Sequence, residues 1–361
     1  MTLTPRRAGL PGAVLLALLG ATPWIGALWP ITGDRWRDQV AAPLVLLSFG
    51  GAMLLAALLA QADPWLGAFV VFVAGSAMLR PSPAALATLE VVLAGALAVA
   101  VARAGGPAWR RLLTAGLVAF GVVQVVYTTG QLAGYDPLWF GLERRSDLVP
   151  MGTIRSQGLL GAYLAVVTPL APLVLIPVLV AGVVMSGSAV AGLGVAAGLT
   201  LRFRARLRWW GVAAVGAGLA LVLVLGHARL VESLTWRWSV WALGLSEWTT
   251  SAVLVGRGFG AWSAEMPTRY AAWLGRPGTY GILPTHAHSE LVQLLYEGGL
   301  VALGLLALWL LRHRAAWRGP AGGAMAAAAV VSLGGFPLHV PTTALLIAAV
   351  LGLATVTPTP A

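Results

Sequence analysis

Cysteine and lysine are both absent from this 361-residue chain, and charged residues of either sign are scarce. Without cysteine, disulfides and thiol chemistry are excluded, and cysteine usage says nothing about the redox compartment. Only 10% of the residues are charged, compared with about 25% in soluble domains. Because 59% are hydrophobic and the mean hydropathy is +0.85, the composition predicts a polytopic membrane protein rather than a chain with one anchor.

All the basic residues are therefore arginine, and they exceed the acidic residues by 23 to 12, which gives a net charge of +11. A strongly basic balance often indicates nucleic-acid binding, but membrane proteins also collect arginine in their cytoplasmic loops. We therefore expect the lipid bilayer, and no nucleic acid, as a partner.

Apolar runs of about 20 residues predict the membrane spans. The clear ones are 10–29, 41–60, 65–79, 84–102, 112–130, 209–226 and 289–311. The first run follows Arg6 and Arg7 and resembles a signal peptide. It lacks a good small-x-small cleavage site and further spans follow it, so we interpret it as a retained helix.

Two apolar regions, 157–201 and 321–356, are too long for one span each at 1.5 Å per residue. The first is expected to form three short helices, broken near Pro169–Pro177 and at Ser186–Ser188. The second is expected to form two helices, divided at Gly334–Pro337. The fold class is thus all-α, with about 12 transmembrane helices and a single integral membrane domain over residues 1–361.

Four arginine clusters give the orientation. They lie at residues 6–7, 103–111, 202–208 and 312–318, without any acidic residue among them. Since arginine collects in cytoplasmic loops, all four clusters and both termini are predicted to be cytoplasmic. Loop 61–64 should then be cytoplasmic too, although it carries Asp63 and no arginine. Among the acidic residues expected in spans, Glu90 is the one predicted to be buried.

Residues 227–288 form a long loop that this topology places outside. Its basic residues are Arg229, Arg237, Arg257, Arg269 and Arg276, and its acidic ones are Glu232, Glu247 and Glu265. Surplus arginine on the outer face fits a bound phosphate anion. The alternative is that a long translocated loop ignores the charge rule.

The same loop is rich in tryptophan. Trp238, Trp241 and Trp248 fall close to one face at helical spacing, which predicts an amphipathic helix on the membrane. These rings fit either an interfacial belt or stacking on sugar rings.

Two histidines, His286 and His288, stand directly before the apolar run 289–311. A histidine at a membrane surface can act as a general base near neutral pH, but it can equally just terminate a helix. The neighbouring arginines favour the first interpretation, because they could stabilise a departing diphosphate.

Four stretches carry a resemblance to a known family, in order over residues 120–356. They are Gly152-Thr153 through Ala162-Tyr163-Leu164, then Arg237 with Trp241 and Gly256-Arg257-Gly258-Phe259-Gly260, then His286-Ala287-His288-Ser289 with Gln293, Glu297, Gly299 and Gly304, and finally Gly335-Phe336-Pro337 with Pro341. Together they resemble the O-antigen ligase and polymerase superfamily of bacterial envelope glycan assembly. The chain departs from the family pattern at Gly158, Ala189 and Ala302.

The resemblance implies a GT-C-like fold and an inverting glycosyl transfer that needs neither metal nor cofactor. The donor would be a glycan linked to undecaprenyl diphosphate, at the periplasmic face of the bacterial inner membrane. By this analogy His288 is the general base and Arg237 binds the diphosphate. Further candidates for substrate contacts are Arg155, Arg257, Arg269, Arg276, His286 and Glu297, although Glu297 could instead brace the bundle.

The acceptor stays open: lipid A core in a ligase, a growing glycan in a polymerase, or a protein hydroxyl in a protein O-oligosaccharyltransferase. A transporter or flippase for lipid-linked sugars is the alternative of another class, since many transporters are also polytopic bundles.

Overall fold

The computed structural model describes residues 63–80, 82–138, 148–154, 156–204, 227–246, 250–273, 284–314 and 317–355. The α-helices in these ranges are α3 (Pro64–Leu79), α4 (Pro83–Ala104), α5 (Pro107–Leu132), α6 (Gln157–Val167), α7 (Ile176–Met185), α8 (Ala189–Phe203), α10 (His227–Ser246), α11 (Thr250–Val255), α12 (Ala261–Trp273), α13 (Glu290–Arg312), α14 (Gly319–Leu333) and α15 (Pro341–Ala354). The predicted spans 10–29, 41–60 and 209–226 lie outside the described residues, as do Arg155, Arg276 and Trp248.

The described part is all-helical, and three of its helices are long and apolar enough to cross a membrane: Ala87–Ala104 within α4, α5 and α13. Shorter apolar helices accompany them, as expected of a multi-pass membrane protein. Region 157–201 does form three helices, divided at the predicted prolines and serines, and region 321–356 contains two. Both of these divisions are confirmed.

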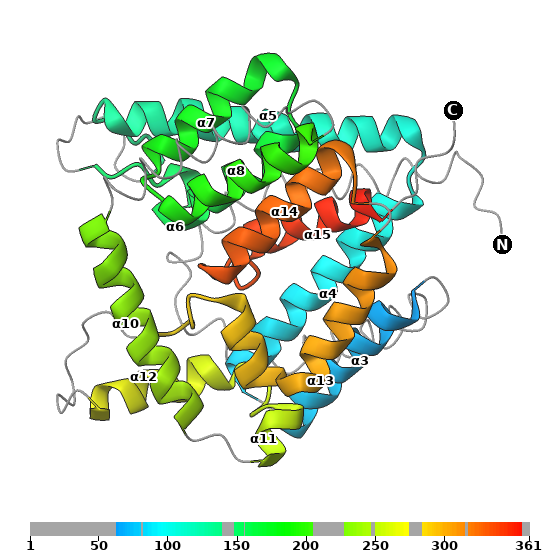
Figure 1. Cartoon of the computed structure of the whole chain (residues 1–361), viewed down its shortest axis with the longest axis vertical. Helices are drawn as coiled ribbons and strands as arrows, with labels where there is room; N and C mark the ends of the chain where they lie inside the picture. Colours follow the sequence, from blue (N-terminus) through cyan, green and yellow to red (C-terminus); the bar gives the residue numbers. More distant parts are fainter. Residues whose placement is uncertain are drawn as a thin grey trace.

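Small residues let α8 approach α14 closely, and Figure 1 shows α14 and α15 between α8 and α4. A Cβ atom on Gly198 would lie 2.8 Å from the carbonyl oxygen of Gly323, and one on Gly323 would lie 2.5 Å from that of Gly198. Between α15 and α4, a Cβ on Gly352 would lie 2.7 Å from the carbonyl oxygen of Val99. Lipid tails give helices little hydrophobic reason to associate, so such close backbone contacts supply much of the packing energy.

The carboxylate of Asp63 bonds to residues at the ends of three helices, α3, α4 and α13. Its carboxylate caps α3 and accepts hydrogen bonds from Arg103 Nη1 at 2.8 Å and Trp309 Nε1 at 2.9 Å, and lies 2.7 Å from His313 Nε2. Burial acts to raise the pKa of Asp63, but the bonds from His313, Arg103 and Trp309 outweigh it and lower the pKa. The lone acidic residue of loop 61–64 is thus paired with residues from two of the predicted cytoplasmic ends.

Glu90 is an exposed side chain that lines a large cavity, so its predicted burial is wrong. The buried carboxylates of the described residues include Glu290 and Glu297 on α13 instead. Hydropathy alone could not separate these cases, because it does not show which face of a helix meets a neighbour.

The glycines of α8 provide a direct test of the helix packing. Gly198→Ala should lower the free energy of unfolding by about 1–3 kcal/mol, because the new methyl group collides with backbone atoms of α14. Gly192→Ala is the matched control, since a Cβ there meets nothing within 4 Å and alanine favours the helix by up to about 1 kcal/mol. Thermal unfolding in detergent measures both variants, and equal effects would contradict the packing.

Candidate functional site

The histidine segment, residues 284–289, is an irregular stretch with several bends that ends at the start of α13. Ser289 caps this helix, with its hydroxyl 3.5 Å from the Val292 amide. His288 just before it has φ of 53°, and no other non-glycine residue in the described ranges has a positive φ. This left-handed conformation costs an ordinary side chain roughly 1–2 kcal/mol, and such strained residues cluster at functional sites.

Ala287, between the two histidines, is fixed by hydrogen bonds on both sides. Its amide donates to Gln293 Oε1 at 3.0 Å, and its carbonyl oxygen accepts a bond of 2.6 Å from Trp241 Nε1. Gln293 lies on α13 and Trp241 on α10. The long loop is therefore attached to the helix through the backbone of the histidine segment.

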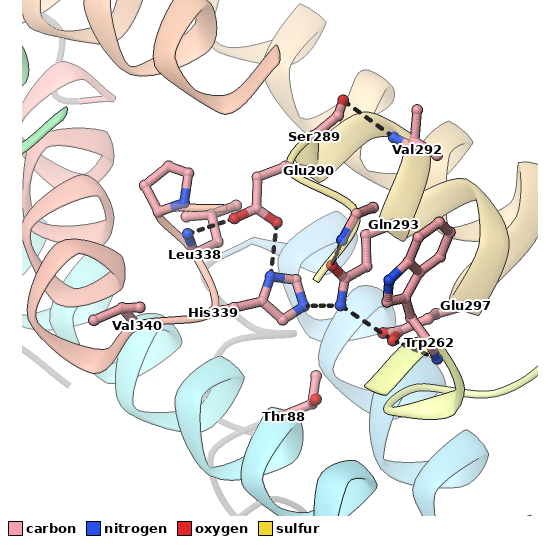
Figure 2. A network of polar contacts seen from close by, with 12 residues as sticks. Thr88, Trp262, Ser289, Glu290, Val292, Gln293, Glu297, Leu338, His339 and Val340 are labelled. Carbon is pink, nitrogen blue, oxygen red and sulfur yellow. Dashed lines mark hydrogen bonds and ion pairs between the residues drawn. The ribbon is translucent and has the colours of Figure 1, made fainter. Parts of the chain in front are cut away.

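Figure 2 shows a row of polar side chains in which Glu290, His339, Gln293 and Glu297 follow one another. Gln293 Nε2 donates to Glu297 Oε1 at 3.2 Å and lies 2.8 Å from His339 Nε2. On its other side, His339 Nδ1 lies 2.9 Å from Glu290 Oε2, and Glu290 Oε1 accepts from the Leu338 amide at 2.6 Å. Because Oε1 of Gln293 already accepts from Ala287, its amino group faces His339.

Glu297 itself accepts a bond from the Trp262 amide at 3.2 Å and is 1% exposed. This geometry fits its predicted bracing role. Although Glu297 lines the large cavity, its oxygen Oε1 is already shared by two protein donors. It is accordingly a weaker candidate for a substrate contact.

Helix α13 is kinked at Gly299, where φ is 61° and ψ is −163°. The kink frees the carbonyl oxygens of Tyr296 and Glu297, which accept bonds of 2.9 Å from the amides of Arg257 and Gly258. A Cβ on Gly299 would lie 2.4 Å from the Leu254 carbonyl oxygen. The backbone of the glycine-rich stretch after α11 therefore packs directly against the kink in α13, and these contacts hold the long loop on this helix.

Aromatic rings enclose the two imidazoles. Phe336 stacks on His286 with centroids 4.5 Å apart, and meets His288 edge-on at 4.8 Å. Trp236 approaches His288 at 5.1 Å, and His339 lies 5.3 Å from His286. These residues come from α10 and from the connection between α14 and α15, so three distant segments form the site.

Burial decides the charge of both histidines. It lowers the pKa of His286 to about 3, with help from the charges of His339 and His288. It lowers that of His288 to about 4, together with the positive charge of Arg237. Both rings are neutral at pH 7, which is the form that accepts a proton.

Arg237 is close to the histidines, as the diphosphate prediction requires. Its Nη1 donates to the Gly334 carbonyl oxygen at 2.7 Å, and burial lowers its pKa. Among the described residues, Arg237 Nε and His286 Nδ1 are buried without a hydrogen-bond partner. Unsatisfied buried polar atoms are rare in proteins, and of these two residues His286 lines the large cavity.

Two of the other predicted arginines, Arg257 and Arg269, lie at a different place, around Glu265. Arg257 Nε lies 3.0 Å and Arg269 Nη2 lies 2.7 Å from Glu265 Oε2, and Tyr296 also donates to this carboxylate at 3.0 Å. Glu265 therefore partly neutralises the charges of Arg257 and Arg269. Of the predicted basic residues, Arg237 alone among those described is found beside His288.

A cavity of about 880 Å³ begins at this site and continues between α4, α13, α14 and α15. Its polar lining includes His286, His339, Glu290 and Ser263, and most of the remaining lining is apolar, down to Trp309 and Trp317. It could hold a molecule with a polar head and a long hydrocarbon tail. Within the described ranges, no group of three or more His, Asp or Glu side chains is arranged to hold a metal ion.

Sequence reasoning missed His339, Trp236 and the role of Glu290. The Gly335-Phe336-Pro337 stretch predicted a helix break, and His339 follows it by two residues, but nothing in the pattern indicated contact with residues 286–290. Trp241 was predicted as an interfacial or sugar-stacking ring, whereas its indole N–H binds Ala287. Trp238 is exposed, as either alternative requires.

Neither a protein-family model nor a curated protein matches this chain. The family resemblance therefore stays a prediction that depends on the quoted residues.

The left-handed backbone at His288 can be tested apart from any activity. His288→Gly should be more stable than His288→Ala by about 1 kcal/mol, because only glycine adopts this φ without strain. Both variants lose the imidazole, so their difference in thermal unfolding reports the backbone. Greater stability of the alanine variant would contradict the conformation.

Proposed function

We propose that the protein is a membrane glycosyltransferase of the O-antigen ligase type, which moves a glycan from a polyprenyl diphosphate to an acceptor hydroxyl. The observation that carries this proposal is the amphipathic cavity, which has imidazoles at one end and apolar side chains along its length. We further propose about 12 spans, a GT-C-like arrangement, cytoplasmic termini, and loop 227–288 on the periplasmic side.

The cavity fits such a donor by its chemistry. A polyprenyl chain is entirely hydrocarbon, so its transfer from lipid into an apolar cavity costs little, while the diphosphate needs positive charge. Arg237 does not itself line the cavity, but it lies close to His288 near the polar end, and its buried Nε has no hydrogen-bond partner within the protein. Guanidinium groups bind phosphate oxygens in pairs, which would also orient the leaving group.

In the proposed step, neutral His288 accepts the proton of the acceptor hydroxyl as its oxygen attacks the anomeric carbon. The carbon–oxygen bond to the diphosphate breaks on the opposite face, so the configuration inverts. The diphosphate leaves with its negative charge stabilised by Arg237. The imidazolium formed on His288 is then balanced by that departing anion, which offsets the unfavourable burial of its charge.

Substitution of the base and of the cation tests these roles. His288→Gln should lower the transfer rate by about 10²–10⁴-fold, as removal of a general base does. Arg237→Gln should weaken donor binding about 10–100-fold, as loss of a charged hydrogen bond does. Purified protein is assayed with a synthetic polyprenyl-diphosphate glycan and a range of acceptors.

Arg314→Gln, at the end predicted to be cytoplasmic, is the matched control and should retain both rate and affinity. Full activity of the His288 variant would remove the base assignment. Equal effects at Arg237 and Arg314 would remove the diphosphate assignment.

The pH dependence follows from the lowered pKa of His288. Since the neutral ring is the active form, kcat/KM should stay level from about pH 5 to 8 and fall only as the pH approaches 4. Arg237→Gln removes one cause of the low pKa, so the acid limb should move up toward the ordinary value near 6.5. A wild-type inflection near 6.5 would show that His288 is not buried as described, or is not the base.

A further inference from the structure

A second cavity, of about 580 Å³, lies at the opposite end of the bundle from the histidines. It is lined by Arg110, Arg111, Thr114, Ala115, Val118, Ala119, Leu170, Ala171, Pro172, Leu175 and Arg202. These residues belong to the first turns of α5, the connection from α6 to α7, and the last turn of α8. Figure 1 shows α5, α7 and α8 close together.

Three arginines from two distant segments meet at this cavity, and none of its lining residues is acidic. Arg202 donates through Nη1 to the carbonyl oxygens of Pro169 and Ala171, at 2.8 and 2.5 Å, which leaves its Nε and Nη2 for another acceptor. Arg110 uses Nε to bind the Gly105 carbonyl oxygen, and Arg111 is exposed. Because no acidic side chain in the lining balances these arginines, the cavity is suited to bind an anion.

Apart from Thr114, the rest of the lining is apolar, and part of it follows one face of α5 while the other part belongs to the α6–α7 connection. Positions 110–111, 114–115 and 118–119 recur every four residues, so they form a continuous stripe. From Arg110 to Val118 the stripe is about 12 Å long at 1.5 Å per residue, close to half of a hydrocarbon core of about 30 Å. The small side chains of Ala115 and Ala119 leave room along it for one hydrocarbon chain.

We propose that this cavity binds an anionic phospholipid, with its phosphate headgroup on Arg110, Arg111 and Arg202 and an acyl chain along the α5 stripe. The arginines lie near helix ends, on the face that the arginine clusters predict to be cytoplasmic. Bacterial and other cytoplasmic leaflets carry anionic lipids, which basic pockets between helices recognise. The site is separate from the histidine site and does not depend on the proposed function.

Native mass spectrometry of the purified protein with added lipids tests the proposal. The wild type should bind phosphatidylglycerol at least tenfold more tightly than phosphatidylcholine. The double variant Arg110→Gln with Arg111→Gln should lose affinity for phosphatidylglycerol about 30-fold, which corresponds to about 1 kcal/mol for each arginine at a membrane surface. Arg312→Gln with Arg314→Gln is the matched control and should bind as the wild type does.

Ala119→Phe provides a second, independent variant, because it fills the stripe and leaves every arginine in place. It should also reduce phosphatidylglycerol binding by tenfold or more. Soluble glycerol phosphate should compete poorly, since it lacks the acyl chain. Equal binding of the two lipids, equal loss in both double variants, or full competition by glycerol phosphate would each overturn the proposal.

Discussion

The side-chain amide of Gln293 is the contact on which the histidine site depends. It accepts from the Ala287 backbone and donates to Glu297, and it lies against His339. The backbone at Ala287, helix α13 and the connection between α14 and α15 are thereby held by one group that is 1% exposed. An amide can do this because it offers both a donor and an acceptor without a charge, so its burial costs much less than that of an ion. Loss of this group would leave the Ala287 amide and the Glu297 carboxylate incompletely paired in a region of low dielectric constant.

Helix α13 carries a polar anchor near each of its ends. At its start, Gln293, Glu290 and Glu297 organise the site, and at its other end Trp309 and the adjoining His313 bind Asp63. The apolar cavity lies along the helix between these anchors. Buried polar groups are costly in a membrane protein unless they bind one another, and the groups at both ends of α13 do so. Among the described residues, the buried side-chain atoms without a hydrogen-bond partner include Arg237 Nε and His286 Nδ1 beside the histidine site, and their proximity to one another is the reason to expect a ligand there.

Much of the fold could be predicted from the sequence, because lipid imposes a simple rule on helix length and apolar content. The helices at 65–79, 84–102, 112–130 and 289–311 and the subdivision of 157–201 followed from it. The kink at Gly299 did not follow, because a glycine inside an apolar run has the same hydropathy in a straight or a bent helix. Among the predicted site residues, Arg237 lies near His288, whereas Arg257 and Arg269 pair with Glu265. Helix α12 places Glu265 and Arg269 side by side at i,i+4, which their spacing could have indicated. The pairing of Glu265 with Arg257 depends on how the loop folds back, which sequence separation does not encode. For the same reason His339 could not be found: its link to Gln293 exists only once α14 and α15 have packed.

Formation of a new glycosidic bond tests the central claim most directly. Purified protein is reconstituted in liposomes with a polyprenyl-diphosphate glycan and candidate acceptors, and the product is examined by mass spectrometry and by NMR of the anomeric centre. The account predicts a covalent product whose anomeric configuration is inverted relative to the donor. Movement of the lipid-linked glycan across the bilayer, without transfer to any acceptor, would contradict it and favour a flippase.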